Sequence, residues 1–270
     1  MDLGTIEDVV IPDDRSGLPP GRPDTAVIAG GTWLLSEKQD HLRTLVDITA
    51  LRWVPLVEHD DGLDIAATCT IEQLSRSASD REWPATVLFG QCAAALLASF
   101  KIWKVATVGG NICLALPAGA MTSLATALDG VARVWSADGN DYEIPVVDLV
   151  TGPHVNALRP GDVVRSIFLP AHALGARTAF RKLALSPLGR SASVVIGRVD
   201  SDGRFVVSVT ASTVRPYVLT FPEPPSRAEL DSALTEKIPD SAWYDDPHGA
   251  PDWRRHISMG SARDILEELA

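Results

Sequence analysis

Two glycine-centred segments carry the residues of this chain that are best suited to bind a ligand. They are 29–32 (AGGT) and 107–111 (TVGGN), and each follows an apolar run where we expect a strand to end. Small residues at such a turn let several backbone N–H groups converge on one anionic oxygen. Two such turns could hold a pyrophosphate from both sides, which would suit a dinucleotide. The pattern differs from the Gly-x-Gly-x-x-Gly fingerprint of a Rossmann domain, which this sequence lacks.

A simpler interpretation exists for each segment taken alone. A Gly-Gly pair after a strand is commonly a turn that needs positive φ and binds nothing. In this chain, however, side chains that can form hydrogen bonds stand beside both pairs, namely Thr32, Thr107 and Asn111. Their presence favours phosphate binding without excluding the simpler interpretation.

The composition excludes several classes of function. The chain has 270 residues, of which 46% are hydrophobic, enough for one large or two medium domains. Its net charge of −11 argues against nucleic acid or an anionic membrane as partner. The longest apolar run, 92–99, is too short to span a bilayer, and the acidic N-terminus is unlike a signal peptide. We therefore expect a cytoplasmic protein whose phosphate site uses backbone amides more than basic side chains.

Metal chemistry is not indicated by the sequence. The three cysteines, Cys69, Cys92 and Cys113, form no CxxC or CxH pattern, so we expect no zinc site or iron–sulfur cluster in this chain. Reduced, buried cysteines are the simplest interpretation. The six histidines have no metal-binding spacing, and none is assigned a catalytic role.

The pattern of apolar residues predicts an α+β protein in two parts, with a boundary near residue 172. Strands are predicted at 26–29, 45–48, 53–58, 63–67, 131–135, 142–144, 163–169, 178–185, 191–199 and 204–213. Helices are predicted from a capping box at Thr70 and at 84–100, 117–128, 226–237 and 252–269. Long alternating strands followed by helices after residue 172 indicate a separate α+β domain.

Six stretches of the chain, in order and with matching spacing, resemble one protein family. They are VIAGGTWLL (27–35), LVDITALRWVPLVEHDDGLDIAATCTIEQL (45–74), ATVGGNICLALPAGAMTSLATALDGVARV (106–134), GDVVRSIFLP (161–170), FRKLALSPLGRSASVVIG (180–197) and DWRRHISMGSARDILEEL (252–269). The chain resembles the FAD-binding medium subunit of molybdenum hydroxylases, as found in bacterial carbon monoxide dehydrogenase and in the flavin domain of xanthine dehydrogenase. The resemblance covers nearly the whole chain.

The resemblance implies a fold, a cofactor and partners. The fold would be a two-lobed FAD-binding domain of the PCMH type over 1–172, followed by a smaller α+β C-terminal domain over 173–270. The cofactor would be non-covalent FAD. The partners would be an iron–sulfur subunit and a molybdenum-cofactor subunit. Electrons would pass from the partner's clusters through FAD to a soluble acceptor, so the chain would be an oxidoreductase subunit with no catalytic acid or base of its own.

The same resemblance implies which residues hold FAD. Backbone amides of the two glycine segments would bind the pyrophosphate, Val164 would pack on the cofactor, and Lys182 would reach the flavin edge, where a cation could stabilise the reduced ring. A solvated strand lysine and a packing tryptophan are the simpler interpretations of Lys182 and Trp33. The complete predicted set is Ala29, Gly30, Gly31, Thr32, Trp33, Thr107, Gly109, Gly110, Asn111, Val164 and Lys182.

The sequence also departs from the family pattern. The usual Gln-Ile-Arg-Asn before the second segment is Lys-Ile-Trp-Lys (101–104), and Ala120 replaces an aspartate on the ribose side of FAD. Losing such a hydrogen bond could weaken binding by about 1–3 kcal/mol. In the C-terminal domain, Ser186 and Arg190 stand where the family has arginine and aspartate. Two alternatives therefore stay open: a degenerate relative that serves as a structural or assembly module, and a stand-alone flavin oxidase.

Overall fold

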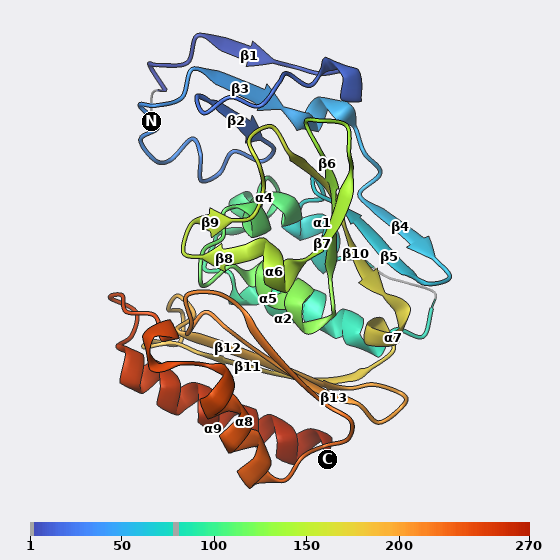
Figure 1. The fold of residues 1–270 in the computed structure, drawn as a ribbon, viewed down its shortest axis with the longest axis vertical. Coiled ribbons are helices and arrows are strands. Elements are labelled where there is room, and N and C mark those ends of the chain that lie inside the picture. The colour runs from blue at the N-terminus through green and yellow to red at the C-terminus, as the bar shows by residue number, and fades with distance from the viewer. Residues whose placement is uncertain (1–2, 78–80) are drawn as a thin grey trace.

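The fold has three layers stacked along its long axis. A computed structural model describes residues 3–77 and 81–270. Figure 1 shows a small N-terminal sheet at one end, a middle lobe of helices and long strands, and a C-terminal sheet covered by helices at the other end. The predicted α+β class with a two-lobed first part and an antiparallel C-terminal sheet is confirmed.

The N-terminal layer is a three-stranded parallel sheet in the order β1-β3-β2. Its strands are β1 (Asp8–Val10), β2 (Thr25–Ile28) and β3 (Thr44–Asp47). The predicted strands at 26–29 and 45–48 are β2 and β3, whereas β1 was not predicted. Val46 in the central strand is buried with Ile48 and Val163, which places this small core against the middle lobe. The end of β2 therefore points toward the middle lobe.

The middle lobe is built on a five-stranded antiparallel sheet in the order β4-β5-β10-β6-β7. Two tight hairpins form where Asp-Gly pairs predicted them, and Gly139 in the second has a φ of 83°. The strands are β4 (Leu56–His59), β5 (Gly62–Ala66), β6 (Val131–Trp135), β7 (Tyr142–Pro145) and β10 (Val163–Pro170). A small ribbon of β8 (Val150–Gly152) and β9 (Val155–Asn156), also not predicted, lies beside it.

Short helices fill the middle lobe. Helix α1 (Ile71–Ser75) begins with both hydrogen bonds of the capping box predicted at Thr70. The other short helices up to the C-terminal sheet are η1 (Arg15–Gly17), η2 (Ile48–Leu51), η3 (Pro84–Thr86), α2 (Val87–Ala95), α3 (Phe100–Trp103), α4 (Val108–Cys113), α5 (Ala120–Ala127), α6 (Val146–Leu149) and α7 (Ala171–Leu174).

Three predictions about these helices are wrong. The segment 84–100 is not one helix, because α2 ends at Ala95 and Leu96 has extended backbone angles. The helix predicted from Pro117 begins only at Ala120. The second glycine segment is not a turn after a strand: it follows helix α3, and Gly109 and Gly110 lie inside helix α4. In all three cases, packing against neighbouring elements overrides local sequence preference.

The C-terminal layer is a four-stranded antiparallel sheet that is buried on both faces. Strand β12 sends Val194 and Ile196 into the core of the middle lobe, while Val195 packs with Ile265 of α9 in a second core. Figure 1 shows α8 and α9 on the outer face of this sheet. The elements are β11 (Arg177–Leu183), β12 (Ser193–Val199), β13 (Phe205–Thr210), β14 (Tyr217–Phe221), α8 (Arg227–Lys237), η4 (Asp240–Ala242) and α9 (Pro251–Leu269). Strand β14 was not predicted.

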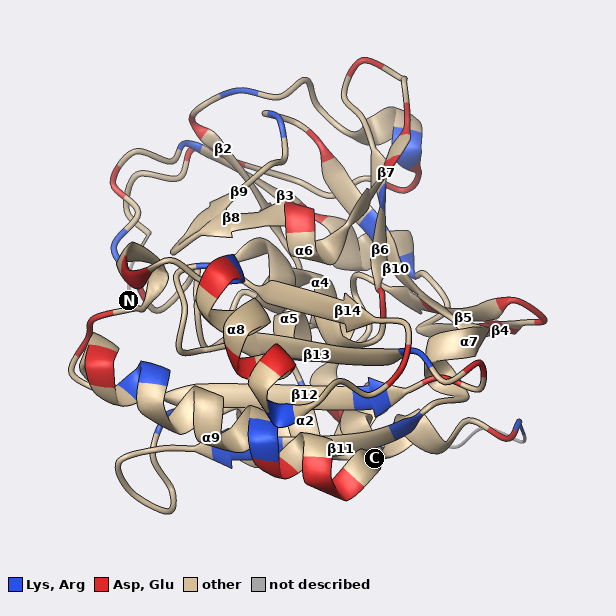
Figure 2. Cartoon of the chain, turned by 60° about the horizontal axis from the view of Figure 1, so that its bottom comes forward, with Lys and Arg blue, Asp and Glu red and all other residues tan. Residues whose placement is uncertain are grey.

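Charged groups of both signs are spread over the outer helices, and Figure 2 shows basic and acidic residues interspersed along α8 and α9. Over residues 3–77 and 81–270, no helix is both long enough and apolar enough to cross a membrane.

A buried arginine joins the C-terminal sheet to helix α5. Arg198 on β12 is 1% exposed, and its Nε donates to Asp200 Oδ1 at 2.8 Å. Its other nitrogens donate to the Ala127 carbonyl at the end of α5 and to Asp129. Burial alone would raise the pKa of Asp129, but Arg198 and His172 hold that pKa below its ordinary value. The guanidinium therefore compensates two carboxylates and caps a helix at once.

Replacing this arginine should destabilise the fold. Arg198→Met removes the fully buried counter-ion of Asp129 and Asp200 and leaves them only the partly exposed Arg204, so we expect the free energy of unfolding to fall by about 3–5 kcal/mol. Arg227→Met is the matched control, because its ion pair with Glu267 is mostly exposed and should contribute less than about 1 kcal/mol. Urea denaturation of both variants measures the difference, and equal losses would show that the Arg198 network contributes no more than a surface pair.

Candidate functional site

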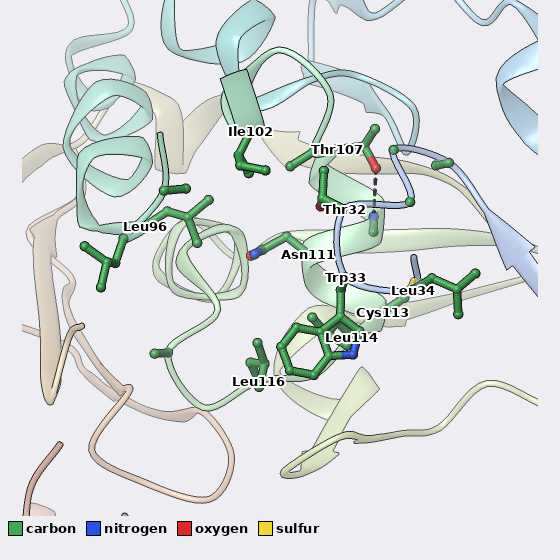
Figure 3. A pocket seen from close by; sticks show the side chains of 18 of the residues that line it. Thr32, Trp33, Leu34, Leu96, Ile102, Thr107, Asn111, Cys113, Leu114 and Leu116 are labelled. Carbon is green, nitrogen blue, oxygen red and sulfur yellow. Dashed lines mark hydrogen bonds between the residues drawn. The ribbon is translucent and has the colours of Figure 1, made fainter. Parts of the chain in front are cut away.

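Both glycine segments border one cavity of about 810 Å³. Its walls are formed by the end of β2 and the loop after it (27–34), by the end of α2 and the segment after it (95–99), and by residues of α4 and the loop that follows it. Figure 3 shows Thr32 and Trp33 on one side of this space, Leu96 on the other, and Asn111 between them. The N-terminal and middle layers therefore enclose the site together.

The first glycine segment is an open loop with unused backbone donors. Gly31 has a φ of 64°, in the left-handed region that favours glycine. The amide of Leu35 donates to the Gly31 carbonyl at 2.9 Å, which folds the loop back on itself. Within the described residues, the N–H groups of residues 30–34 donate no hydrogen bond. Such a run of free amides beside a left-handed residue is the geometry of a backbone anion site.

The second glycine segment is arranged differently. The first four amides of α4 all donate inside the protein: Val108 to the Cys69 carbonyl at 2.9 Å and Gly109 to the Ala67 carbonyl at 3.0 Å. Gly110 donates to Thr107 Oγ1 at 3.1 Å, and Asn111 donates to the Thr107 carbonyl at 2.9 Å. The segment therefore shapes the cavity, while its helical amides are already satisfied.

Asn111 has one structural end and one free end. Its Oδ1 accepts a hydrogen bond from the amide of Met121 at 2.8 Å, which caps the start of α5. Its Nδ2 has no hydrogen-bond acceptor within the described residues, and the side chain faces the cavity (Figure 3). Thr32 Oγ1 also has no hydrogen bond to any of the residues that the structure describes. Asn111 and Thr32 are thus available to a ligand, whereas Thr107 is occupied.

Close backbone contact explains why glycine stands at two of these positions. A Cβ atom on Gly30 would lie 2.0 Å from the Val105 carbonyl oxygen, and one on Gly109 would lie 2.4 Å from the Ala67 Cβ. Real side chains never approach so closely, so only glycine lets the first loop lie against the chain that leads into α4. The two segments are brought together by this contact.

Several predicted site residues do not line the cavity. Gly109 is buried under Ala67, and Val164 lies in the core of the middle lobe, paired with Val134. Lys182 is half-buried on β11, opposite Val194. The predicted residues that do line the cavity are Ala29, Gly30, Gly31, Thr32, Trp33, Thr107, Gly110 and Asn111. Their individual roles stay predictions.

Ala120, where the family pattern has an aspartate, is the first residue of α5 and is 2% exposed in the core. It does not line the cavity, although Ala118 does.

The cavity contains basic groups but no acidic ones among the described residues. In a chain of net charge −11, its lining includes Arg190 and His248 and neither aspartate nor glutamate. Burial raises the pKa of the Cys113 thiol to about 12, so this third ionisable group is neutral. The apolar walls lower the local dielectric and strengthen any charge interaction inside. The electrostatics therefore favour an anionic ligand.

The place of Arg190 and His248 in the cavity wall was not predicted from the sequence. Both belong to the C-terminal part of the chain, far in sequence from the glycine segments. In the sequence, Arg190 is only a departure from the family pattern, and a lone basic residue in a polar loop gives no stronger signal. Trp33 contacts His154 with ring centroids 5.5 Å apart, so its ring is partly held by packing.

Substituting Gly30 should show whether its close contact with the Val105 backbone matters more than the general effect of replacing glycine by alanine. In Gly30→Ala the new Cβ must push back the Val105 backbone, and we expect a loss of about 1–3 kcal/mol in the free energy of unfolding. Gly90→Ala in α2 is the control, because its Cβ meets nothing within 4 Å and should stabilise the helix by about 0.5–1 kcal/mol. Urea denaturation of the ligand-free proteins tests this, and a neutral Gly30→Ala would contradict the contact.

Comparison with known proteins shows the family of this chain. Residues 16–172 match the family described as "FAD binding domain in molybdopterin dehydrogenase". The chain is 30% identical over 165 residues to a xanthine dehydrogenase FAD-binding subunit of Escherichia coli O157:H7, a match covering 58% of this chain and 54% of that protein. It is 25% identical over 279 residues to a K12-strain protein provisionally named xanthine dehydrogenase FAD-binding subunit XdhB, covering 94% of this chain and 92% of that protein.

Solved structures show the same fold over the whole chain. A reconstituted CO dehydrogenase from Oligotropha carboxidovorans matches with a TM-score of 0.80 at 19% identity, covering 99% of this chain and 98% of that one. Quinoline 2-oxidoreductase from Pseudomonas putida 86 matches with a TM-score of 0.78 at 16% identity, with the same coverage. The predicted resemblance, including FAD as the family cofactor and the oxidoreductase class, is confirmed. The chain belongs to the family of FAD-binding domains of molybdopterin dehydrogenases.

Proposed function

We propose that this chain binds FAD non-covalently in the cavity and passes electrons from iron–sulfur clusters of a partner subunit to an external acceptor. The observation that supports it most is the row of free amides at 30–34, which borders a cavity that has no acidic residue among the described part of an acidic protein. FAD is elongated, and its central pyrophosphate carries two negative charges. These charges are complementary to the basic groups in the cavity wall. When bound, it supplies a ring that accepts and releases electrons.

Residues on two sides of the cavity would contribute differently to FAD binding. The amides of residues 30–34 would hold the pyrophosphate, with Thr32 and the Nδ2 of Asn111 adding side-chain donors. Gly109 and Thr107 would act indirectly, because their hydrogen bonds fix the α4 wall. Val164 would act through the core on which the cavity rests.

A heteromeric enzyme fits the surface around the cavity. Large apolar side chains near its rim are exposed: Leu97 is 59% exposed, Phe100 66% and Leu188 85%. Exposed apolar groups of this size favour a protein partner. We propose that an iron–sulfur subunit covers them and that a molybdenum-cofactor subunit completes the enzyme. We also propose a cytoplasmic location, which the free thiols of the three cysteines support, and a domain boundary near residue 172.

The test is FAD retention by the purified chain, with Asn111 as the probe. After incubation with FAD and desalting, we expect the wild-type protein to keep flavin near one per chain. Asn111→Asp preserves the acceptor that caps α5 but replaces the Nδ2 donor with a carboxylate oxygen. We expect FAD to bind at least about tenfold more weakly, a change of about 1.4 kcal/mol, without a loss of protein stability.

Asn111→Ala is the companion variant. It removes the cap as well, so the free energy of unfolding should fall by about 1 kcal/mol. Unchanged FAD affinity in Asn111→Asp would contradict the role of this side chain. A wild-type chain that stays colourless both alone and with its partner subunits would contradict the proposed function and favour the structural-module alternative.

A further inference from the structure

Arg190 and His248 are unpaired basic side chains in the cavity wall. Arg190 lies in the loop between β11 and β12, and His248 lies between η4 and α9. Within the described residues neither side chain has a hydrogen bond or an ion pair. Most other arginines of this layer are paired, as with Arg181 and Glu268 or Arg263 and Asp231. An unpaired arginine on an apolar wall is available to a ligand.

A second buried arginine holds both loops in place. Arg254 of α9 is 1% exposed, and its Nη1 donates to the Ala192 carbonyl at 2.7 Å. Its Nε donates to the Gly249 carbonyl at 2.8 Å. Ala192 follows Arg190 by two residues and Gly249 follows His248 directly. One guanidinium therefore fixes the backbone beside both basic residues, so the backbone from which they extend is set before any ligand arrives.

The same contacts place Arg190 at a particular end of the cavity. The Ser191 hydroxyl donates to the Ala95 carbonyl at 3.1 Å, which ties this loop to the end of α2 and thus to Leu96. In Figure 3, Leu96 lies on the opposite side from Thr32 and Trp33. Arg190 is therefore at the end away from the open glycine loop that would hold the pyrophosphate. A dinucleotide held there at its central pyrophosphate would extend one of its two ends toward the Arg190 loop, and the potential measurement below distinguishes the flavin end from the adenosine end.

We infer that Arg190, with His248 beside it, contacts the flavin ring and stabilises its reduced form. The inference rests on the proposed binding of FAD. Uptake of two electrons and one proton leaves one negative charge on the ring, and an arginine in an apolar cavity interacts more strongly with that anion than with the neutral oxidised ring. Arg190 thereby raises the reduction potential of the flavin and favours electron arrival from the partner.

Lys182 is the natural comparison for this assignment. It lies on the strand that precedes the Arg190 loop and, by strand alternation, on the same face as Phe180, which packs against the middle lobe. It does not line the cavity. The geometry thus assigns the role predicted for Lys182 to Arg190 instead.

The experiment measures the midpoint potential of bound FAD at one fixed pH, by equilibration with a reference dye, together with the affinity for oxidised FAD. In Arg190→Gln we expect oxidised FAD to bind with nearly unchanged affinity and reduced FAD to bind about tenfold more weakly. For a two-electron couple, this lowers the potential by about 30 mV. Arg190→Lys keeps the charge and should restore most of the potential, and His248→Gln should lower it in the same direction.

Lys182→Gln is the matched control and should leave the potential unchanged. The inference is overturned if Arg190→Gln binds FAD at the wild-type potential, or if Lys182→Gln lowers the potential as much as Arg190→Gln does. An equal loss of affinity for oxidised FAD and for reduced FAD would also overturn it, since Arg190 would then bind the pyrophosphate. Failure of the wild-type chain to bind FAD is a different result, because it contradicts the proposed function itself.

Discussion

The site depends on the contact between Gly30 and the Val105 carbonyl. At this point the N-terminal layer touches the chain that enters α4, with no room for a side chain. The contact sets the distance between the first glycine loop and the cavity wall formed by Asn111. Next to this contact, Gly31 adopts the left-handed region that glycine reaches without strain, and the amides of residues 30–34 donate no hydrogen bond within the described residues. A loop with free backbone donors at the edge of the cavity follows from this packing.

The third layer completes the cavity rather than standing apart from it. The C-terminal sheet is buried on both faces, so its inner face shares a core with the middle lobe. The buried Arg198 secures this interface through the Ala127 carbonyl and Asp129, and the buried Arg254 holds the loops of the third layer itself through the carbonyls of Ala192 and Gly249. The cost of burying each charge is offset by its several hydrogen bonds. This rigid arrangement lets loops of the C-terminal layer bring Arg190 and His248 to the cavity.

Much of this architecture could be predicted from the sequence, because its signals are local. Alternating apolar residues identified the long strands, the Asp-Gly pairs identified both hairpins, and Thr70 with Gln73 identified the start of α1. The first glycine loop was also predicted correctly as a turn after a strand. What failed depends on tertiary contacts. Alanine-rich sequence around Leu96 favours helix locally, yet α2 ends there.

The differing roles of the two glycine segments could not be predicted for the same reason. Both have the same local composition, but Gly109 is glycine because of the Ala67 backbone and side chain, which are distant in sequence. Whether an amide is free or already bonded depends on such neighbours. Likewise, nothing local marks Arg190 as facing the cavity, since its position comes from Ser191 and Arg254 contacts across the fold.

Residue-resolved amide hydrogen exchange, with and without FAD, tests the central claim most directly. Gly109 and Asn111 donate within the protein, so their amides should exchange slowly in the free chain and remain slow with FAD. The amides of residues 30–34 should exchange rapidly in the free chain and become protected when FAD binds. If FAD binds and these five amides stay unprotected, or if Gly109 and Asn111 exchange rapidly until FAD arrives, then the first loop does not hold the pyrophosphate as proposed.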